Sequence, residues 1–170
     1  MSIVLSPEEV LQFLACVKSR KHRAILTACY GAGLRISEAV ARTLPAIDSK
    51  RVVLRVEQGK GQKDRYVMLS PKLLEILRDW WRMERPDHWL FPGDKPGRHI
   101  TTNAVAFECR HVQRICKIPK PITPHSLRHA FALRANISET SLVPLINEQG
   151  EKEKDRDVAL GKAWERGNRT

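Results

Sequence analysis

The segment Gly31–Glu38 places an arginine directly behind two glycines, at a point where a new helix is expected to begin. The first backbone N–H groups of a helix have no partner within it, so these groups and the guanidinium of Arg35 can face one phosphate. Glu38 follows Arg35 by one helical turn and can pair with it and hold it in place. The alternative is that Gly33 only ends the preceding helix and Arg35 is a solvated surface charge.

A second candidate is Lys60, which lies between Gly59 and Gly61. A lysine at such a flexible turn can reach into a groove, where its ammonium contacts a phosphate or donates a proton to a leaving oxygen. The sequence contains no G-x-x-x-x-G-K-[ST] pattern, so this glycine-rich turn is not a P-loop. An ordinary charged turn is the alternative.

The third candidate motif is His125-Ser126-Leu127-Arg128, which places His125 and Arg128 three residues apart at the start of a helix. Residues at this spacing share a helix face, so both can point at one phosphate. His125 and His129 are four residues apart, as in some zinc sites, but Ser126 stands where the metalloprotease pattern needs a glutamate. A capping or partly buried role is the alternative for His125, and packing is expected for His129.

The charge of the chain favours a polyanionic partner. Its 170 residues include 30 Lys and Arg against 19 Asp and Glu, a net charge of +11, and such an excess points first to nucleic acid. Residues 1–150 hold 24 of the basic and 14 of the acidic residues, so +10 lies in the body of the chain. The candidate DNA-binding residues lie in the most basic segment: Lys50, Arg51, Arg55, Lys63 and Arg65.

Other classes of function lack their signals. The sequence contains no apolar run of about 18 residues and no signal peptide, so we expect a cytoplasmic protein without a membrane partner. The four cysteines form no C-x-x-C pair, which favours buried thiols over a metal site. We therefore expect no metal and no cofactor, and no carboxylate cluster supports a metal-dependent nuclease.

The elements that must position these residues are mostly helices. Ser6-Pro7-Glu8-Glu9 combines an N-cap, a proline and a capping-box glutamate, and Ser70-Pro71 repeats the cap and the proline. Apolar spacing predicts helices over residues 24–30, from Ile36, and from Thr101 or Thr102, with a short helix opening at Thr123-Pro124.

A β-hairpin is expected between the helices. The run Arg51–Val56 is rich in β-branched residues, the turn around Gly59 follows it, and Arg65–Leu69 is extended again. The fold class is therefore mainly α with a small antiparallel sheet. We expect one domain over residues 1–134 and a divergent tail over residues 135–170, either weakly helical or disordered, because the composition changes abruptly near Arg134.

Taken in order, these motifs resemble the catalytic domain of the tyrosine recombinases, the phage-integrase family. The resemblance rests on G-x-G-L-R-x-S-E, then G-K-G-x-K-D-R, then T-P-H-S-L-R-H-A-F-A, and runs from about Ser6 to Phe131 or Ala132. It implies that Arg35 and Arg128 clamp the scissile phosphate and that Lys60 is the general acid. His125 would be the first residue of the His-x-x-Arg motif, and Glu38 would be the supporting carboxylate.

The resemblance also implies chemistry without metal or ATP. Two guanidinium groups can stabilise the charge on a phosphodiester under attack, and a tyrosine nucleophile forms a 3′-phosphotyrosine that keeps the bond energy for rejoining. This chain departs from the family pattern because its two tyrosines, Tyr30 and Tyr66, both precede His125. The second histidine or tryptophan of the family site has no matching residue, since the context of Trp164 differs.

The expected function is that of a DNA-binding, integrase-type recombination domain of a mobile element. It would break and rejoin DNA through a phosphotyrosine, with other recombinase subunits as further partners, but would be defective in cleavage alone. We expect an incomplete, frameshifted or rearranged C-terminus and no N-terminal clamp domain. The alternative is a non-catalytic DNA-binding or regulatory module that uses the same basic face.

Overall fold

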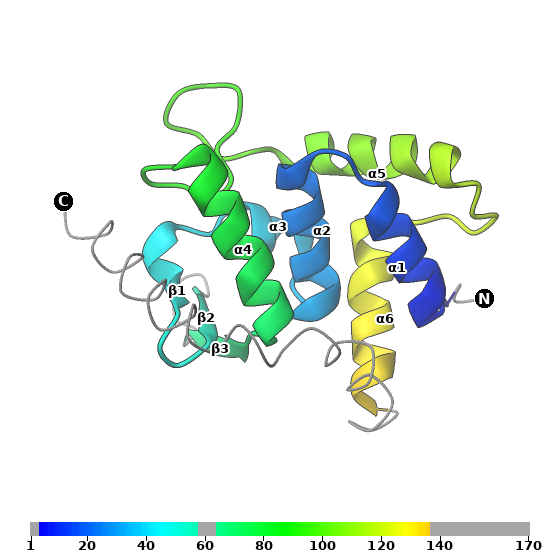
Figure 1. Cartoon of the computed structure of the whole chain (residues 1–170), viewed down its shortest axis with the longest axis horizontal. Helices are drawn as coiled ribbons and strands as arrows, with labels where there is room; N and C mark the ends of the chain where they lie inside the picture. Colours follow the sequence, from blue (N-terminus) through cyan, green and yellow to red (C-terminus); the bar gives the residue numbers. More distant parts are fainter. Residues whose placement is uncertain (1–3, 58–63, 137–170) are drawn as a thin grey trace.

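Six α-helices, a short 3₁₀ helix and a three-stranded sheet make up the described part of the chain in a computed structural model (Figure 1). The structure describes residues 4–57 and 64–136. The elements in chain order are α1 (Pro7–Cys16), α2 (Arg20–Gly31), α3 (Ile36–Val40), η1 (Leu44–Ala46), β1 (Ile47–Asp48), β2 (Val53–Val56), β3 (Arg65–Met68), α4 (Pro71–Glu84), α5 (Thr102–Cys116) and α6 (Pro124–Asn136).

The helices begin where the capping residues predict. Ser6 caps α1 by accepting from Glu9 N at 3.2 Å, and Glu9 returns the bond from its carboxylate to Ser6 N at 2.8 Å. Ser70 caps α4 by accepting from Leu73 N, and Thr101 caps α5 by accepting from Ala104 N. These side chains satisfy N–H groups that the first helical turn leaves open. The predicted starts of these three helices are confirmed.

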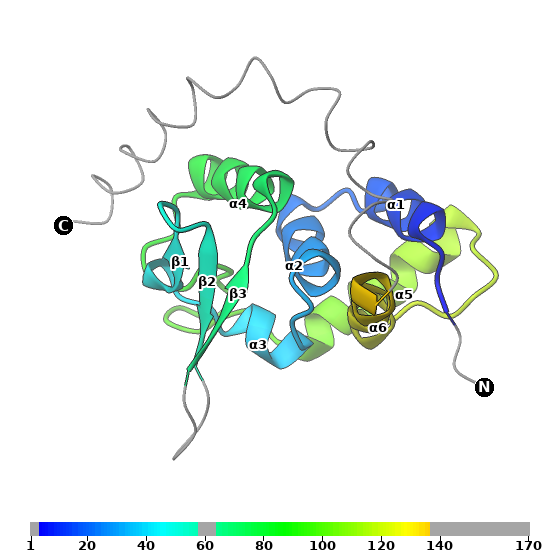
Figure 2. The same cartoon turned by 90° about the horizontal axis from the view of Figure 1, so that it is seen from below.

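The predicted hairpin is also confirmed, and it gains a third strand. β2 pairs antiparallel with β3, with Leu54 opposite Val67 and Val56 opposite Arg65, and β1 pairs antiparallel with β2 on its other side. The end of β2 at Val56 and the end of β3 at Arg65, which the hairpin connection joins, point away from α4 (Figure 2). Lys60 and Lys63 belong to the connection between these strands and lie outside the described residues.

One apolar core joins the helices. α2 lies at the centre, with α4 on one side and α6 on the other (Figure 2). Phe13 of α1, Leu26 of α2, Leu77 of α4 and Leu127 of α6 are each at most 2% exposed. The Trp80 indole N–H donates to the Leu90 carbonyl at 2.7 Å, which satisfies its polar atom inside this core. The core therefore holds α2 and α6 side by side.

Candidate functional site

The turn between α2 and α3 brings α6 close to the start of α3. Gly33 has a φ of +66°, a conformation that glycine adopts without the steric cost of a side chain. A Cβ atom at this position would overlap the ring of Phe131 in α6. The lack of a side chain at Gly33 therefore allows α6 to pack directly against the turn that precedes Arg35.

Arg35 and Glu38 form the predicted pair. The backbone N–H of Arg35 donates to Glu38 Oε2 at 3.0 Å, and Arg35 Nη1 lies 3.3 Å from Glu38 Oε1. The Arg35 side chain remains 59% exposed, whereas that of Glu38 is only 12% exposed. The pair therefore leaves most of the guanidinium accessible to a ligand.

A second arginine binds the same carboxylate. Arg65 of β3 donates from Nη1 to Glu38 Oε1 at 2.9 Å and from Nη2 to Glu38 Oε2 at 2.8 Å. Burial alone raises the pKa of the Glu38 carboxyl, but the hydrogen bonds from Arg65 and the Arg35 backbone, and the charges of both arginines, bring it below its ordinary value. Sequence reasoning assigned Arg65 to the DNA-binding surface and did not identify this pair.

Arg42 is a buried cation that the sequence analysis missed. It is 7% exposed, and its guanidinium donates from Nε to the Glu38 carbonyl at 2.6 Å and from Nη1 to the Arg55 carbonyl at 3.0 Å. Burial lowers its pKa, while the carboxylates of Glu57 and Glu38 oppose that shift. Arg42 thus joins α3 to β2. The sequence signal for this contact is the position of Arg42 four residues after Glu38, near the end of a helix, where an arginine can bind the last backbone carbonyls.

α6 carries His125 and Arg128 on neighbouring turns. Leu127 and Ala130 face the core, His125 is exposed and Arg128 is half-buried. The helix begins with a reciprocal cap, in which Thr123 Oγ1 accepts from Ser126 N at 3.1 Å and Ser126 Oγ accepts from Thr123 N at 3.2 Å. This cap fixes the first turn of α6, which holds His125.

Electrostatics link Arg128 to the region around Glu38. Burial, with Cys109 and Glu38 adding to it and Arg128 opposing it, raises the pKa of the Cys29 thiol near the end of α2 to about 12. Glu38 and Arg128 thus act with opposite sign on the pKa of one buried thiol. Both α3 and α6 pack against α2.

The remaining predicted DNA-binding residues lie on the sheet and its turns. Lys50 and Arg51 are exposed in the turn after β1, and Arg51 Nε lies 3.8 Å from Asp48 Oδ2. Arg55 of β2 forms an ion pair with Glu57 at 3.0 Å.

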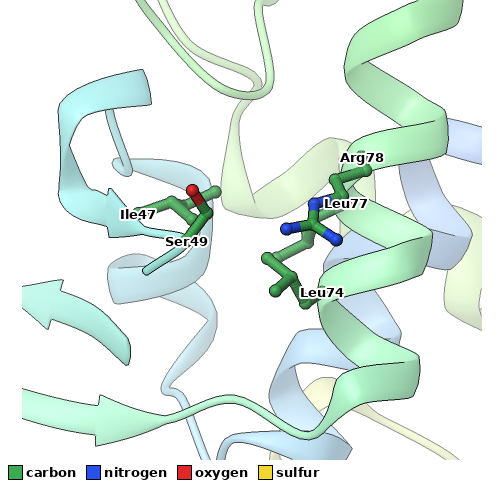
Figure 3. A pocket seen from close by; sticks show the side chains of 5 residues that line it. All are labelled: Ile47, Ser49, Leu74, Leu77 and Arg78. Atoms are coloured by element: carbon green, nitrogen blue, oxygen red, sulfur yellow. The ribbon is translucent and has the colours of Figure 1, made fainter. Parts of the chain in front are cut away.

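Two hollows in the described part of the chain are lined by none of the predicted site residues. One, too narrow to admit a water molecule, separates Ile47 and Ser49 from the side chains of α4 (Figure 3). The other is an open groove of about 470 Å³, which is lined by Arg110, Gln113, Arg114, Lys117 and Ile118. The first is a packing seam, and sequence reasoning did not identify the second.

Three further observations concern the described residues. They contain no group of three His, Cys, Asp or Glu side chains placed to hold a metal ion. None of their helices is long and apolar enough to cross a membrane. Tyr30 is 7% exposed inside α2, whereas Tyr66 is 65% exposed on β3.

Comparison with known proteins places the chain in a family. It matches the model of the phage integrase family over residues 4–163. It is 65% identical over 133 residues to an integrase/recombinase of Sinorhizobium fredii, which covers 78% of this chain and 43% of that protein. It is 36% identical over 120 residues to tyrosine recombinase XerD of Pseudomonas putida, which covers 66% of this chain and 40% of that protein. The chain therefore belongs to the phage integrase family.

The chain spans about half the length of the Sinorhizobium relatives that it matches, 43% of one and 59% of another. The family match also includes residues 135–163, which the sequence analysis set apart as a divergent tail. That segment lies outside the described residues except for the end of α6, which continues past Arg134 to Asn136.

Solved structures share the fold. The crystal structure of XerA recombinase superposes with a TM-score of 0.73 at 20% identity, over 100% of this chain and 60% of that one. The Tn1549 transposon integrase in complex with circular intermediate DNA gives 0.68 at 19% identity, over 94% and 61%. The predicted fold class, mainly helical with a small antiparallel sheet like a tyrosine recombinase catalytic domain, is confirmed.

Proposed function

We propose that this chain is the phosphate-activating part of a mobile-element integrase and that it acts on duplex DNA in the cytoplasm. In this proposal Arg35 and Arg128 bind the non-bridging oxygens of one scissile phosphate. His125 contacts the same group from the start of α6. The observation that carries the proposal is the packing of α6 against the Gly33 turn, because it brings the helix of His125 and Arg128 to the element that begins with Arg35.

The residue types suit a phosphoryl transfer without a metal. A phosphodiester under attack spreads negative charge over its non-bridging oxygens, and fixed guanidinium groups stabilise that charge through paired N–H donors. As the phenolate oxygen of a tyrosine bonds to phosphorus, the bond to the 5′ oxygen breaks, and Lys60 donates a proton to that leaving oxygen. Glu38 supports Arg35 through the contacts described above.

In this proposal the nucleophilic tyrosine is neither of the two tyrosines among the described residues. The 170 residues contain only Tyr30 and Tyr66, and both precede His125. Tyr30 is buried in α2, and Tyr66 is fixed in the strand that carries Arg65. An attacking oxygen must approach the phosphorus in line with the leaving group. Recruiting either tyrosine would require rebuilding the elements that position Arg35 and Arg65.

A DNA partner has two independent supports. The net charge of +11 favours a polyanion, and several structural neighbours are recombinases in complex with DNA. Other recombinase subunits are the second partner in this proposal.

Suicide DNA substrates test the proposal. Such a substrate is nicked so that cleavage releases a short fragment and traps the covalent protein–DNA adduct. The chain is incubated alone, and also with a full-length Sinorhizobium-type integrase whose own clamp arginine is replaced by alanine. We expect no adduct at the mass of this chain, 19.4 kDa, and an adduct at the mass of the relative that requires this chain.

Substitutions in this chain decide between the outcomes. Arg35→Ala should abolish the stimulated adduct, whereas Arg82→Ala, a matched change on α4, should preserve it. A tyrosine-linked adduct of this chain alone that Tyr66→Phe or Tyr30→Phe removes would overturn the proposal. DNA binding without any stimulation of the relative would favour the second candidate, a DNA-binding or regulatory module, which the positions of the two tyrosines support.

A further inference from the structure

Glu38 is shared unequally between two arginines. Arg65 places two N–H donors on the two carboxylate oxygens at 2.8 and 2.9 Å, which is the bidentate arrangement of a strong ion pair. Arg35 places only one side-chain nitrogen near the carboxylate, and its distance of 3.3 Å is longer. The single negative charge of Glu38 is therefore matched mainly by Arg65.

The exposure of the two arginines follows the same division. The Arg65 side chain is 35% exposed with its fork turned onto Glu38, whereas that of Arg35 is 59% exposed. A guanidinium has five N–H donors, and the described contacts engage one side-chain nitrogen of Arg35. Arg35 thus keeps donors and positive charge that a phosphate can use.

We propose that Arg65 is a positioning residue, which acts through Glu38 to keep the guanidinium of Arg35 open to a DNA phosphate. This inference rests on the proposed function for its DNA-binding consequence. It reassigns a residue whose charge alone indicated direct contact with DNA.

Arg42 limits how far Glu38 can move. Its guanidinium holds the Glu38 carbonyl at 2.6 Å and the Arg55 carbonyl of β2 at 3.0 Å. β2 in turn pairs with the strand that carries Arg65, through Val56 opposite Arg65. The backbone of Glu38 and the strand that presents Arg65 are therefore tied to one buried cation, which keeps the carboxylate and the Arg65 fork in register.

Loss of Arg65 would leave the carboxylate with Arg35 as its main partner. The two residues are three apart, a spacing at which side chains on a helix meet. The carboxylate would then take a second donor of Arg35 and compete with a phosphate for the same guanidinium. If Arg65 contacted DNA directly, its charge would instead contribute to DNA affinity whether or not Glu38 were replaced.

A double-mutant cycle on duplex DNA affinity separates these roles. Arg65→Gln should weaken binding about fivefold or more in the wild-type chain and less than about twofold in a Glu38→Gln chain, because coupled residues give non-additive effects. Arg65→Lys should fail to restore affinity, since lysine keeps the charge but lacks the fork. The control is Arg55→Gln on the neighbouring strand. It should reduce DNA affinity by the same factor in the wild-type and Glu38→Gln chains.

Equal losses from Arg65→Gln in both backgrounds, together with full binding by Arg65→Lys, would overturn the inference and make Arg65 a DNA contact. A wild-type chain that fails to bind DNA would instead overturn the proposed function. For that reason the second measurement uses no DNA. It follows the hydrogen exchange of the Arg35 side-chain N–H groups by NMR.

In the NMR experiment, Arg65→Gln should slow exchange at Arg35 severalfold, because Glu38 then engages a second donor of that guanidinium. Arg55→Gln should leave the exchange unchanged. Unaltered exchange at Arg35 in a folded Arg65→Gln chain would contradict the inference, whether or not the protein binds DNA.

Discussion

At the scale of single residues, a carboxylate beside a proposed phosphate site needs a physical reason. An isolated negative charge there would repel the ligand. Glu38 is neutralised by Arg65, accepts the backbone N–H of Arg35 and is 12% exposed. It therefore fixes the start of α3 while leaving the surrounding charge positive.

The first prediction concerns the pH dependence of this carboxyl. The pKa of Glu38 in the folded chain lies below its ordinary value of 4.5, so its contribution to stability is present above that value and lost as pH falls through the folded pKa. Glu38→Gln should lower the unfolding free energy at pH 7 by roughly 1–3 kcal/mol, and the difference should shrink below pH 4.5. Urea denaturation between pH 3 and pH 7 measures this.

Glu75→Gln is the matched control, because Glu75 forms an exposed helical pair with Lys72 at 3.7 Å. It should change the unfolding free energy by less than about 0.5 kcal/mol. A Glu38→Gln difference that stays constant from pH 3 to pH 7 would contradict the assignment of the ionised carboxylate to this network.

Residue spacing predicted the pair of Arg35 with Glu38, but it did not predict the contacts of Glu38 with Arg65 and Arg42. The Arg35–Glu38 pair follows from a separation of three residues, which is fixed by helical geometry. Arg65 lies 27 residues from Glu38, and the two meet only because β3 pairs with β2 beside α3. Arg42 was missed because an arginine is rarely buried, and its burial here depends on two backbone carbonyls from different elements.

At the scale of elements, the Gly33 turn sets the approach of α6 to α3. The ring of Phe131 occupies the place where a side chain at Gly33 would project. Arg128 lies one turn before Phe131, and His125 one turn before Arg128. A shift of α6 away from this turn would therefore move both proposed phosphate ligands together.

The second prediction follows from that contact. Gly33→Ala should reduce the unfolding free energy by roughly 2–5 kcal/mol, since a positive φ costs an L-residue about 1–2 kcal/mol and the overlap with Phe131 adds to it. Gly97→Ala is the control, because Gly97 has a φ of +75° with nothing within 4 Å of an added Cβ. Urea denaturation compares the two variants.

A Phe131→Ala background tests the source of the difference. In that background, the loss of unfolding free energy caused by Gly33→Ala should fall to that caused by Gly97→Ala, because only the strain of the positive φ remains. Equal costs for Gly33→Ala and Gly97→Ala in the chain that keeps Phe131 would contradict the proposed packing of α6 on the turn.

Elements with local signals were predicted, and those made by tertiary pairing were not. Ser6, Ser70 and Thr101 mark helix starts because a capping side chain bonds within its own turn. The strand β1 has only two residues and is defined by its pairing with β2, so no periodic pattern in the sequence predicts it. α6 extends over 13 residues rather than forming a short helix, because Leu127 and Ala130 pack against the core.

At the scale of the whole molecule, the strands β2 and β3 run from the side of α4 toward the side of α3 (Figure 2). α3 and α4 lie on opposite sides of α2 (Figure 2). The end of β2 at Val56 and the end of β3 at Arg65 extend past α3. In the proposed complex, DNA bound at the start of α3 therefore lies on the side of α2 opposite α4.

The third prediction concerns the salt dependence of DNA binding. Each phosphate neutralised by a cation contributes about 0.9 to the slope of log affinity against log salt. Lys60→Gln with Lys63→Gln should lower that slope by roughly 2 and weaken binding at low salt. Lys72→Gln with Arg82→Gln removes the same charge from α4 and should leave the slope nearly unchanged.

Fluorescence anisotropy of a labelled duplex over 50–300 mM salt provides the measurement. Equal slopes for the hairpin variant and the wild-type chain would place the DNA-binding face elsewhere. The groove lined by Arg110, Arg114 and Lys117 would then be the next surface to substitute.

The most direct test of the central claim is the structure of this chain bound to a duplex that carries a recombination half-site. The account predicts that Arg35 and Arg128 donate to the non-bridging oxygens of one phosphate, with His125 in contact with the same group and Arg65 still paired with Glu38. Guanidinium groups of Arg35 and Arg128 bound to separate phosphates, or facing opposite sides of the molecule, would contradict it.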